Sequence, residues 1–290
     1  MADLPSQNIQ WFPGHMAKTR RLITENLKNV DAVIELLDAR IPYSSRNPEI
    51  ERLTENKPKI ILLNKASLAD PEMTKKWLAA LKNDNTVCIE TDCITGAGLN
   101  QISPALKKLC AAKLGRYEDK GMSGRMLKAM VLGIPNVGKS SLINKLCGNK
   151  KAKVENRPGV TVDKQWVPTN IGILLLDMPG ILWPKFEDEV VGENLAITGA
   201  IKDDILNIET IACHLCSRLR GQYPDLFAQR YKLGDISALS ELTDYDLLTL
   251  VGRKRGFLVS GGEIDTERAA NMLIDEFRAA KIGRITLDKI

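Results

Sequence analysis

Short apolar runs alternate with amphipathic stretches over the first part of the chain. The runs are rich in Val, Ile and Leu, as is typical of strands buried on both faces of a sheet, and they cover residues 31–39, 59–65, 86–91, 127–133 and 172–180. Residues 71–83 and 98–115 carry apolar positions at helical spacing, the first with Pro at its start and the second with Gly at its end. This alternation predicts a three-layer α/β fold with a mainly parallel sheet.

The pattern changes after residue 186. Strand-like runs almost vanish, and residues 239–256 and 265–283 have the spacing of amphipathic helices that end at glycine. We therefore predict two domains, an α/β domain over residues 1–186 and a small all-helical domain over residues 187–290.

A phosphate-binding loop follows the predicted strand at residues 127–133. Residues 133–140, GIPNVGKS, fit the pattern G-x-x-x-x-G-K-[ST], and a helix is predicted directly after them. We expect the backbone N–H groups of Val137, Gly138 and Ser141 to face the phosphates of a nucleotide. Lys139 would reach the β- and γ-phosphates and act in catalysis, and the Ser140 hydroxyl would bind Mg²⁺. The alternative is a glycine turn without a ligand.

Two further elements fit the same nucleotide. Asp177 opens the sequence DMPG at the end of an apolar run, where its carboxylate would hold Mg²⁺ and the Gly180 N–H would meet the γ-phosphate. Thr161, in NRPGVTVD, is the candidate switch threonine, whose hydroxyl would reach Mg²⁺ only when a triphosphate is bound. A loop threonine that faces solvent is the alternative for Thr161.

Purine-binding groups are expected at the ends of two other strands. Asn64 would bond base N7, and the aliphatic stem of Lys65 would pack on the ring. A second loop, around Thr91 and Asp92, would touch the ring edge through its backbone. Guanine selectivity normally needs a carboxylate two residues after the lysine, but that position holds Ser67. Asp70, three residues further, is another candidate.

The order of these motifs and their amino-acid sequences resemble those of the circularly permuted GTPases of the YlqF type. The resemblance covers essentially the whole chain and is carried by WFPGHMAKTRR, DARIPYSSRNP, NKA, GIPNVGKSSLIN, RPGVT, DMPGILWPKFED, AITGAIKD and SGGEID. It implies a permuted P-loop GTPase fold that hydrolyses GTP to GDP and phosphate with Mg²⁺. It also implies that the protein binds the large ribosomal subunit precursor through rRNA, promotes a late assembly step, and is released by hydrolysis. Ser67 stands where the family has an aspartate.

The groups that activate water are less conventional. Small GTPases place a glutamine directly after the D-x-x-G motif, whereas this chain has Ile181 and Leu182 there. His15 could position water or accept its proton near neutral pH, although a capping or packing histidine is the alternative. The family resemblance implies the catalytic role. It also implies a potassium ion beside the phosphates at Asn136, in place of the positive charge of an arginine finger.

Composition narrows the partners and the location. The chain has 290 residues, 44% hydrophobic and 27% charged, with a net charge of +5, as expected of a soluble globular protein. Because neither a signal peptide nor a long apolar run is recognisable, we expect a cytoplasmic protein with reduced thiols and no membrane partner, and we favour a monomer. Basic clusters at residues 17–21, 107–128, 150–153 and 252–256 are compatible with rRNA backbone contacts.

Two other functions stay open at this point. One is a GTPase in signalling or in another RNA pathway. The other is a non-catalytic, nucleotide-gated RNA-binding module, which the missing glutamine and Ser67 would suit.

Overall fold

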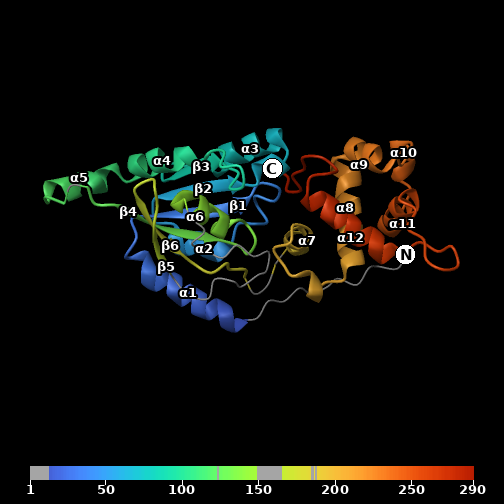
Figure 1. The fold of residues 1–290 in the computed structure, drawn as a ribbon, viewed down its shortest axis with the longest axis horizontal. Coiled ribbons are helices and arrows are strands. Elements are labelled where there is room, and N and C mark those ends of the chain that lie inside the picture. The colour runs from blue at the N-terminus through green and yellow to red at the C-terminus, as the bar shows by residue number, and fades with distance from the viewer. Residues whose placement is uncertain (1–12, 123, 149–164, 184–185, 187) are drawn as a thin grey trace.

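A six-stranded sheet forms one half of the protein (Figure 1). The computed structural model describes residues 13–122, 124–148, 165–183, 186 and 188–290; for residues 13–18, 165 and 236 it describes only the backbone. The strand order is β3 (Thr86–Glu90), β2 (Lys59–Asn64), β1 (Ala32–Asp38), β4 (Leu127–Gly133), β6 (Ile173–Asp177) and β5 (Gln165–Pro168). All neighbours are parallel except β5, which runs antiparallel to β6.

Helices cover both faces of this sheet. The bounds are α1 (Pro13–Leu27), α2 (Pro48–Thr54), α3 (Pro71–Leu81), α4 (Ile102–Leu109), α5 (Ala111–Asp119) and α6 (Lys139–Cys147), with short 3₁₀ turns η1 (Ala66–Leu68) and η2 (Leu99–Gln101). Alternate residues of β1 serve opposite faces: Leu36 joins the cluster that contains α4 and α6, and Leu37 joins the cluster beneath α3. The predicted three-layer α/β fold is confirmed.

The remaining elements are helical, as predicted. They are α7 (Glu189–Ile197), the 3₁₀ turn η3 (Asp203–Ile205), α8 (Ile208–Gln222), α9 (Pro224–Tyr231), α10 (Ile236–Leu239), α11 (Asp244–Lys254) and α12 (Thr266–Arg278). The central helix α8 packs against α7, α9, α11 and α12. Its buried side includes Leu215, Cys216 and Leu219. None of the helices in the described ranges combines the length and apolar character that crossing a bilayer requires.

Some of the predicted elements differ from the structure. The helix predicted over residues 239–256 is shorter, because α10 ends at Leu239 and α11 covers Asp244–Lys254. The single helix predicted over residues 98–115 is wrong: η2, α4 and α5 replace it. The break falls at the buried Cys110, whose backbone leaves the helical region with φ −101° and ψ 13°. Strand β5 was not predicted, because four residues at a sheet edge carry too little periodicity to be recognised.

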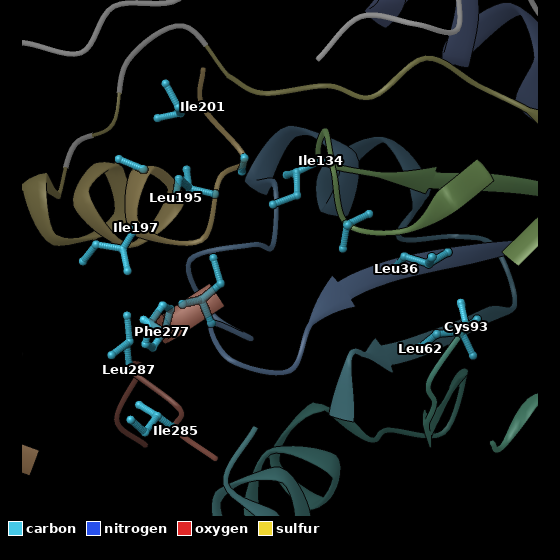
Figure 2. Close-up of a cluster of buried hydrophobic side chains, with 14 of the residues drawn as sticks. Leu36, Leu62, Cys93, Ile134, Leu195, Ile197, Ile201, Phe277, Ile285 and Leu287 are labelled. Atoms are coloured by element: carbon cyan, nitrogen blue, oxygen red, sulfur yellow. The ribbon is translucent and has the colours of Figure 1, made fainter. Parts of the chain in front are cut away.

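One buried apolar cluster runs from the sheet into the helical half (Figure 2). It contains Leu36 and Leu62 of the sheet, Leu195 of α7, and Phe277 of α12. Because this core is continuous across the segment between β6 and α7, the predicted division after residue 186 stays a prediction.

The last residues of the chain return to the sheet and reinforce this junction. The Leu287 N–H donates to the Arg40 carbonyl at 2.7 Å, and the Ile285 N–H donates to the Leu68 carbonyl at 3.2 Å. Asp288 is buried and accepts hydrogen bonds from Ser44, at 2.6 Å, and from Asn194 of α7, at 2.9 Å. The residues that follow β1 and β2 are therefore held from the helical side.

Candidate functional site

The predicted site residues that the structure describes gather at the carboxyl ends of the strands. In the parallel register, Asp38 of β1 lies opposite Asn64 of β2, and Val131 of β4 lies opposite Asp177 of β6. The loops that leave β1, β2, β4 and β6 therefore emerge at one edge of the sheet, which is where open α/β sheets bind ligands.

The loop between β4 and α6 is shaped to turn its N–H groups inward. Asn136 and Gly138 both adopt positive φ, at 57° and 108°. At Gly138 a side chain is excluded twice, because an added Cβ would also lie 2.3 Å from Nδ2 of Asn64. The loop then runs into the amino end of α6, which no side chain of the described residues caps. The first N–H groups of a helix have no partner within it, so this end suits an anion.

Lys139 lies buried across this loop. Its Nζ donates to the carbonyls of Gly133, at 3.1 Å, and Ile134, at 2.8 Å. Burial lowers the pKa of Lys139 to about 8, and the charge of Asp177 opposes that shift. An ammonium group held by two neutral carbonyls is a suitable partner for a phosphate group.

Asp177 is the second charged group of this centre. It is buried, and its Oδ1 atom has no hydrogen-bond partner within the described ranges. Burial raises its pKa, whereas the charge of Lys139 acts in the opposite direction. A buried carboxylate oxygen without a described partner is a fitting ligand for a divalent cation. Asp177 therefore fits Mg²⁺, as does the hydroxyl of Ser140, the second residue of α6.

The D-x-x-G loop touches the phosphate loop directly. The Ile181 N–H donates to the Gly133 carbonyl at 3.3 Å. A Cβ added at Gly180 would lie 2.8 Å from the Lys139 Nζ atom and 3.0 Å from Cα of Pro135. Gly180 thus permits a close approach that any other residue would obstruct.

The Asn64 side chain links the phosphate loop to the two segments that are predicted to bind the base. These segments, called the base loops below, follow β2 and β3. Its Nδ2 donates to the Val137 carbonyl at 2.7 Å, and its Oδ1 accepts the Cys93 N–H at 2.9 Å. The backbone of Thr91 is fixed on both sides, because its N–H donates to Leu63 and its carbonyl accepts from Ala66. Asp92 follows in the same loop and is also buried.

Lys65 is placed by a buried ion cluster that sequence reasoning missed. Its Nζ lies 2.9 Å from Oδ2 of Asp38, which Arg40 also contacts at 2.7 Å. Burial acts to raise the pKa of Asp38, but the charges of Arg40 and Lys65 outweigh it and hold the pKa below its usual range. The motif DAR was visible in the sequence, but its contact with Lys65 requires the pairing of β1 with β2.

Three predicted residues stand apart from this description. Thr161 lies outside the described residues. His15 is in α1, but its side chain is likewise not described. Asn136 is described, and its amide bonds to the helical half: Nδ2 donates to the Gly199 carbonyl, after α7, at 2.7 Å.

Replacing Gly138 by Ala tests whether the phosphate loop and Asn64 form one unit. We expect the variant to lose about 2 kcal/mol or more of unfolding free energy, because the new Cβ displaces the Asn64 amide. Nucleotide affinity, measured by calorimetry with GDP, should fall by about tenfold or more as the loop moves.

Gly121→Ala is the matched control, since Gly121 has a φ of 71° but no heavy atom of the described residues within 4 Å of an added Cβ. It should cost about 1 kcal/mol and leave GDP affinity unchanged. Equal losses of affinity in both variants would contradict the proposed steric link.

Comparison with known proteins matches this geometry. A family described as 50S ribosome-binding GTPase matches residues 128–224, which begin in β4 at the phosphate loop. Ribosome biogenesis GTPase A of Bacillus pumilus is 48% identical over 97% of this chain and 98% of its own length. Mitochondrial ribosome-associated GTPase 1 of Mus musculus is 34% identical over 97% of this chain and 90% of its own.

Solved structures agree over the same length. GNP-bound YlqF from T. maritima has a TM-score of 0.61 at 27% identity, covering 94% of this chain and 98% of that one. A GDP-bound YlqF structure has a TM-score of 0.64, covering 93% and 99%. With the predicted purine-binding segments before the phosphate loop in the chain, and with these full-length relatives, the chain belongs to the ribosome biogenesis GTPase A family of circularly permuted, YlqF-type GTPases.

Proposed function

We propose that this GTPase binds the precursor of the large ribosomal subunit, promotes a late step of its assembly, and hydrolyses GTP to leave it. The observation that carries the proposal is the single centre formed by Asn64, Lys139 and Asp177, which combines a purine side, a phosphate side and a cation side. The assembly role is supported by full-length similarity to proteins named ribosome biogenesis GTPase A.

The residues of the phosphate loop divide the work of binding. The N–H groups of Val137, Gly138 and Ser141 bind phosphate oxygens, and Lys139 exchanges its carbonyl partners for the β- and γ-phosphates. Ser140, Asp177 and Thr161 would hold Mg²⁺, which would supply positive charge at the phosphoryl group. Gly180 brings its N–H to the γ-phosphate.

We assign to Asn136 the binding of a monovalent cation, which would supply positive charge beside the phosphates. Its amide nitrogen is engaged by Gly199, which leaves the amide oxygen as the atom for K⁺. The same bond ties the phosphate loop to the segment after α7. A conformational change at the phosphates would therefore be transmitted to the helical half. Release from a partner requires such a coupling.

Exposed basic side chains suit contact with rRNA. Helix α5 has no buried residue and forms one end of the molecule (Figure 1), where Arg116 and Lys120 are exposed together with Lys107 and Lys108 of α4. Arg253 and Lys254 at the end of α11 are also exposed, in the helical half. Two separated basic surfaces favour an extended phosphate-backbone partner.

The nucleotide state should decide which particle the protein holds. We expect protein loaded with a non-hydrolysable GTP analogue to capture large-subunit precursors from a lysate, and GDP-loaded protein to capture far fewer, because the γ-phosphate orders the loop at Gly180. Capture should weaken steeply as salt rises. The rRNA and proteins of the captured particles are identified by sequencing and mass spectrometry.

Gly138→Ala, whose nucleotide affinity is expected to fall by about tenfold or more, serves as the control with weakened nucleotide binding, and it should capture fewer particles at the same concentration of the GTP analogue. Capture that is the same with GDP, or that enriches small subunits, would contradict the proposal.

Removal of the His15 imidazole tests how water is activated. His15→Ala should keep the GTP affinity of the native protein and lower particle-stimulated phosphate release by about tenfold or more, because Ile181 and Leu182 offer no polar group. His214→Ala, which changes the chain's other histidine, on α8, should keep normal release. Native rates in His15→Ala would remove His15 from the mechanism.

Exchange of potassium for sodium tests the role of Asn136. We expect phosphate release to fall about tenfold in sodium, because the smaller ion fits the amide oxygen and phosphates less well. Asn136→Gly tolerates the same positive φ but lacks the amide, so its rate should be equally low in both salts. Equal rates for the native protein in the two salts would refute this cation site.

A further inference from the structure

We propose that Asp92 and Ser67 together read the guanine base, so that the selectivity carboxylate has moved from one base loop to the other. The inference rests on the proposed function, since it concerns the same nucleotide. Guanine presents two donors on one edge, N1–H and the C2 amine, and a selective site must offer two acceptors there. The position two residues after Lys65 offers only the hydroxyl of Ser67.

The structure places a carboxylate against that hydroxyl. Ser67, in η1, donates from Oγ to Oδ2 of Asp92, which lies 25 residues further along in the loop after β3. The two base loops are therefore in contact through these two side chains. The pair consists of one hydroxyl and one carboxylate. Exchanging the two residues between the loops would leave the same two groups beside each other.

The orientation of the Asp92 carboxylate is fixed by its other oxygen. Oδ1 accepts the N–H groups of Ile94, at 2.9 Å, and Thr95, at 3.0 Å. Burial acts to raise the pKa of Asp92, but the bonds from Ser67 and from these N–H groups outweigh it and lower the pKa. Asp92 is thus an anion at neutral pH, with Oδ2 turned toward Ser67.

The hydrogen bonds of this pair leave two acceptor sites. Among the described residues, Oδ2 receives one hydrogen bond, from Ser67, and retains a further lone pair. Because Ser67 directs its own hydrogen to Asp92, its oxygen can accept one as well. One acceptor on each side chain matches the two adjacent donors of guanine.

Two other carboxylates near the base loops, those of Asp70 and Asp38, are committed elsewhere. Asp70 caps α3 through Oδ1, which accepts the Glu72 and Met73 N–H groups, and its Oδ2 accepts the Tyr223 hydroxyl at 3.1 Å. Asp38 is neutralised by Arg40 and Lys65. Asp92 is the carboxylate that the structure places in contact with Ser67, at the selectivity position.

Asp92→Asn tests the assignment by reversing one hydrogen-bonding group. The amide oxygen must stay on the Ile94 and Thr95 N–H groups, which places the NH₂ group on the Ser67 side. The pair then offers one donor and one acceptor, which matches xanthine, where a carbonyl replaces the C2 amine. We expect the Kd for GDP to rise about tenfold or more, because the variant lacks one acceptor for guanine. The Kd for XDP should fall, because the new NH₂ group can donate to the xanthine carbonyl.

Opposite changes for the two nucleotides are the decisive result, because simple damage to the loop would weaken both. Asp70→Asn is the matched control and should leave the ratio of the two dissociation constants unchanged. The double variant Ser67→Asp with Asp92→Ser exchanges the two groups and should keep the preference for GDP, whereas Ser67→Asp alone sets two carboxylates side by side and should weaken GDP binding.

Each other outcome has a definite meaning. If GDP and XDP weaken equally in Asp92→Asn, or if Asp70→Asn changes the ratio instead, the inference is wrong while the proposed function stands. If the native protein fails to bind GDP in the presence of Mg²⁺, both are wrong.

Discussion

The nucleotide centre depends on the two hydrogen bonds that the side-chain amide of Asn64 makes. This amide is buried at the end of β2 and satisfies two backbone groups from other segments, the Val137 carbonyl and the Cys93 N–H. Without it, two buried polar groups would lose their partners at once, at a cost of about 1–3 kcal/mol each. Because these bonds depend on position in space and not on chain order, a circularly permuted chain can keep them. The permutation therefore leaves the site intact.

The helical half holds the same site from outside, at both of its ends. At the phosphate end, the Gly199 carbonyl accepts the Asn136 amide. At the base end, Arg284 donates to the carbonyls of Ala66 and Ala69, both at 2.8 Å, beside Ser67. The continuous apolar core beneath these contacts makes the two halves resist independent motion (Figure 2). A rearrangement at either end of the nucleotide is thus transmitted to the helices.

The strands and the phosphate loop were predictable because their signals are local. Residues 127–133 form β4 as predicted, and the motif that follows turns into α6 at Lys139. What was missed depends on contacts between distant segments. The pairing of β1 with β2 brings Asp38 to Lys65, and the meeting of two base loops brings Asp92 to Ser67. No spacing within the chain encodes these contacts, so Asp92 was predicted to act only through its backbone.

The order of the permuted chain has a mechanical consequence. In the described part of the chain, the loop at Gly180 is pressed against Pro135 and Lys139, and α7 begins soon afterwards at Glu189. The far end of α7 leads to Gly199, which bonds back to Asn136 in the same phosphate loop. The loop at Gly180, α7 and the phosphate loop are therefore connected to one another in a ring, by the chain and by these contacts. In the proposed function, Gly180 moves when the γ-phosphate leaves. Since packed cores shift between discrete arrangements, that movement would either strain the Asn136 bond or displace α7 and the helices packed on it.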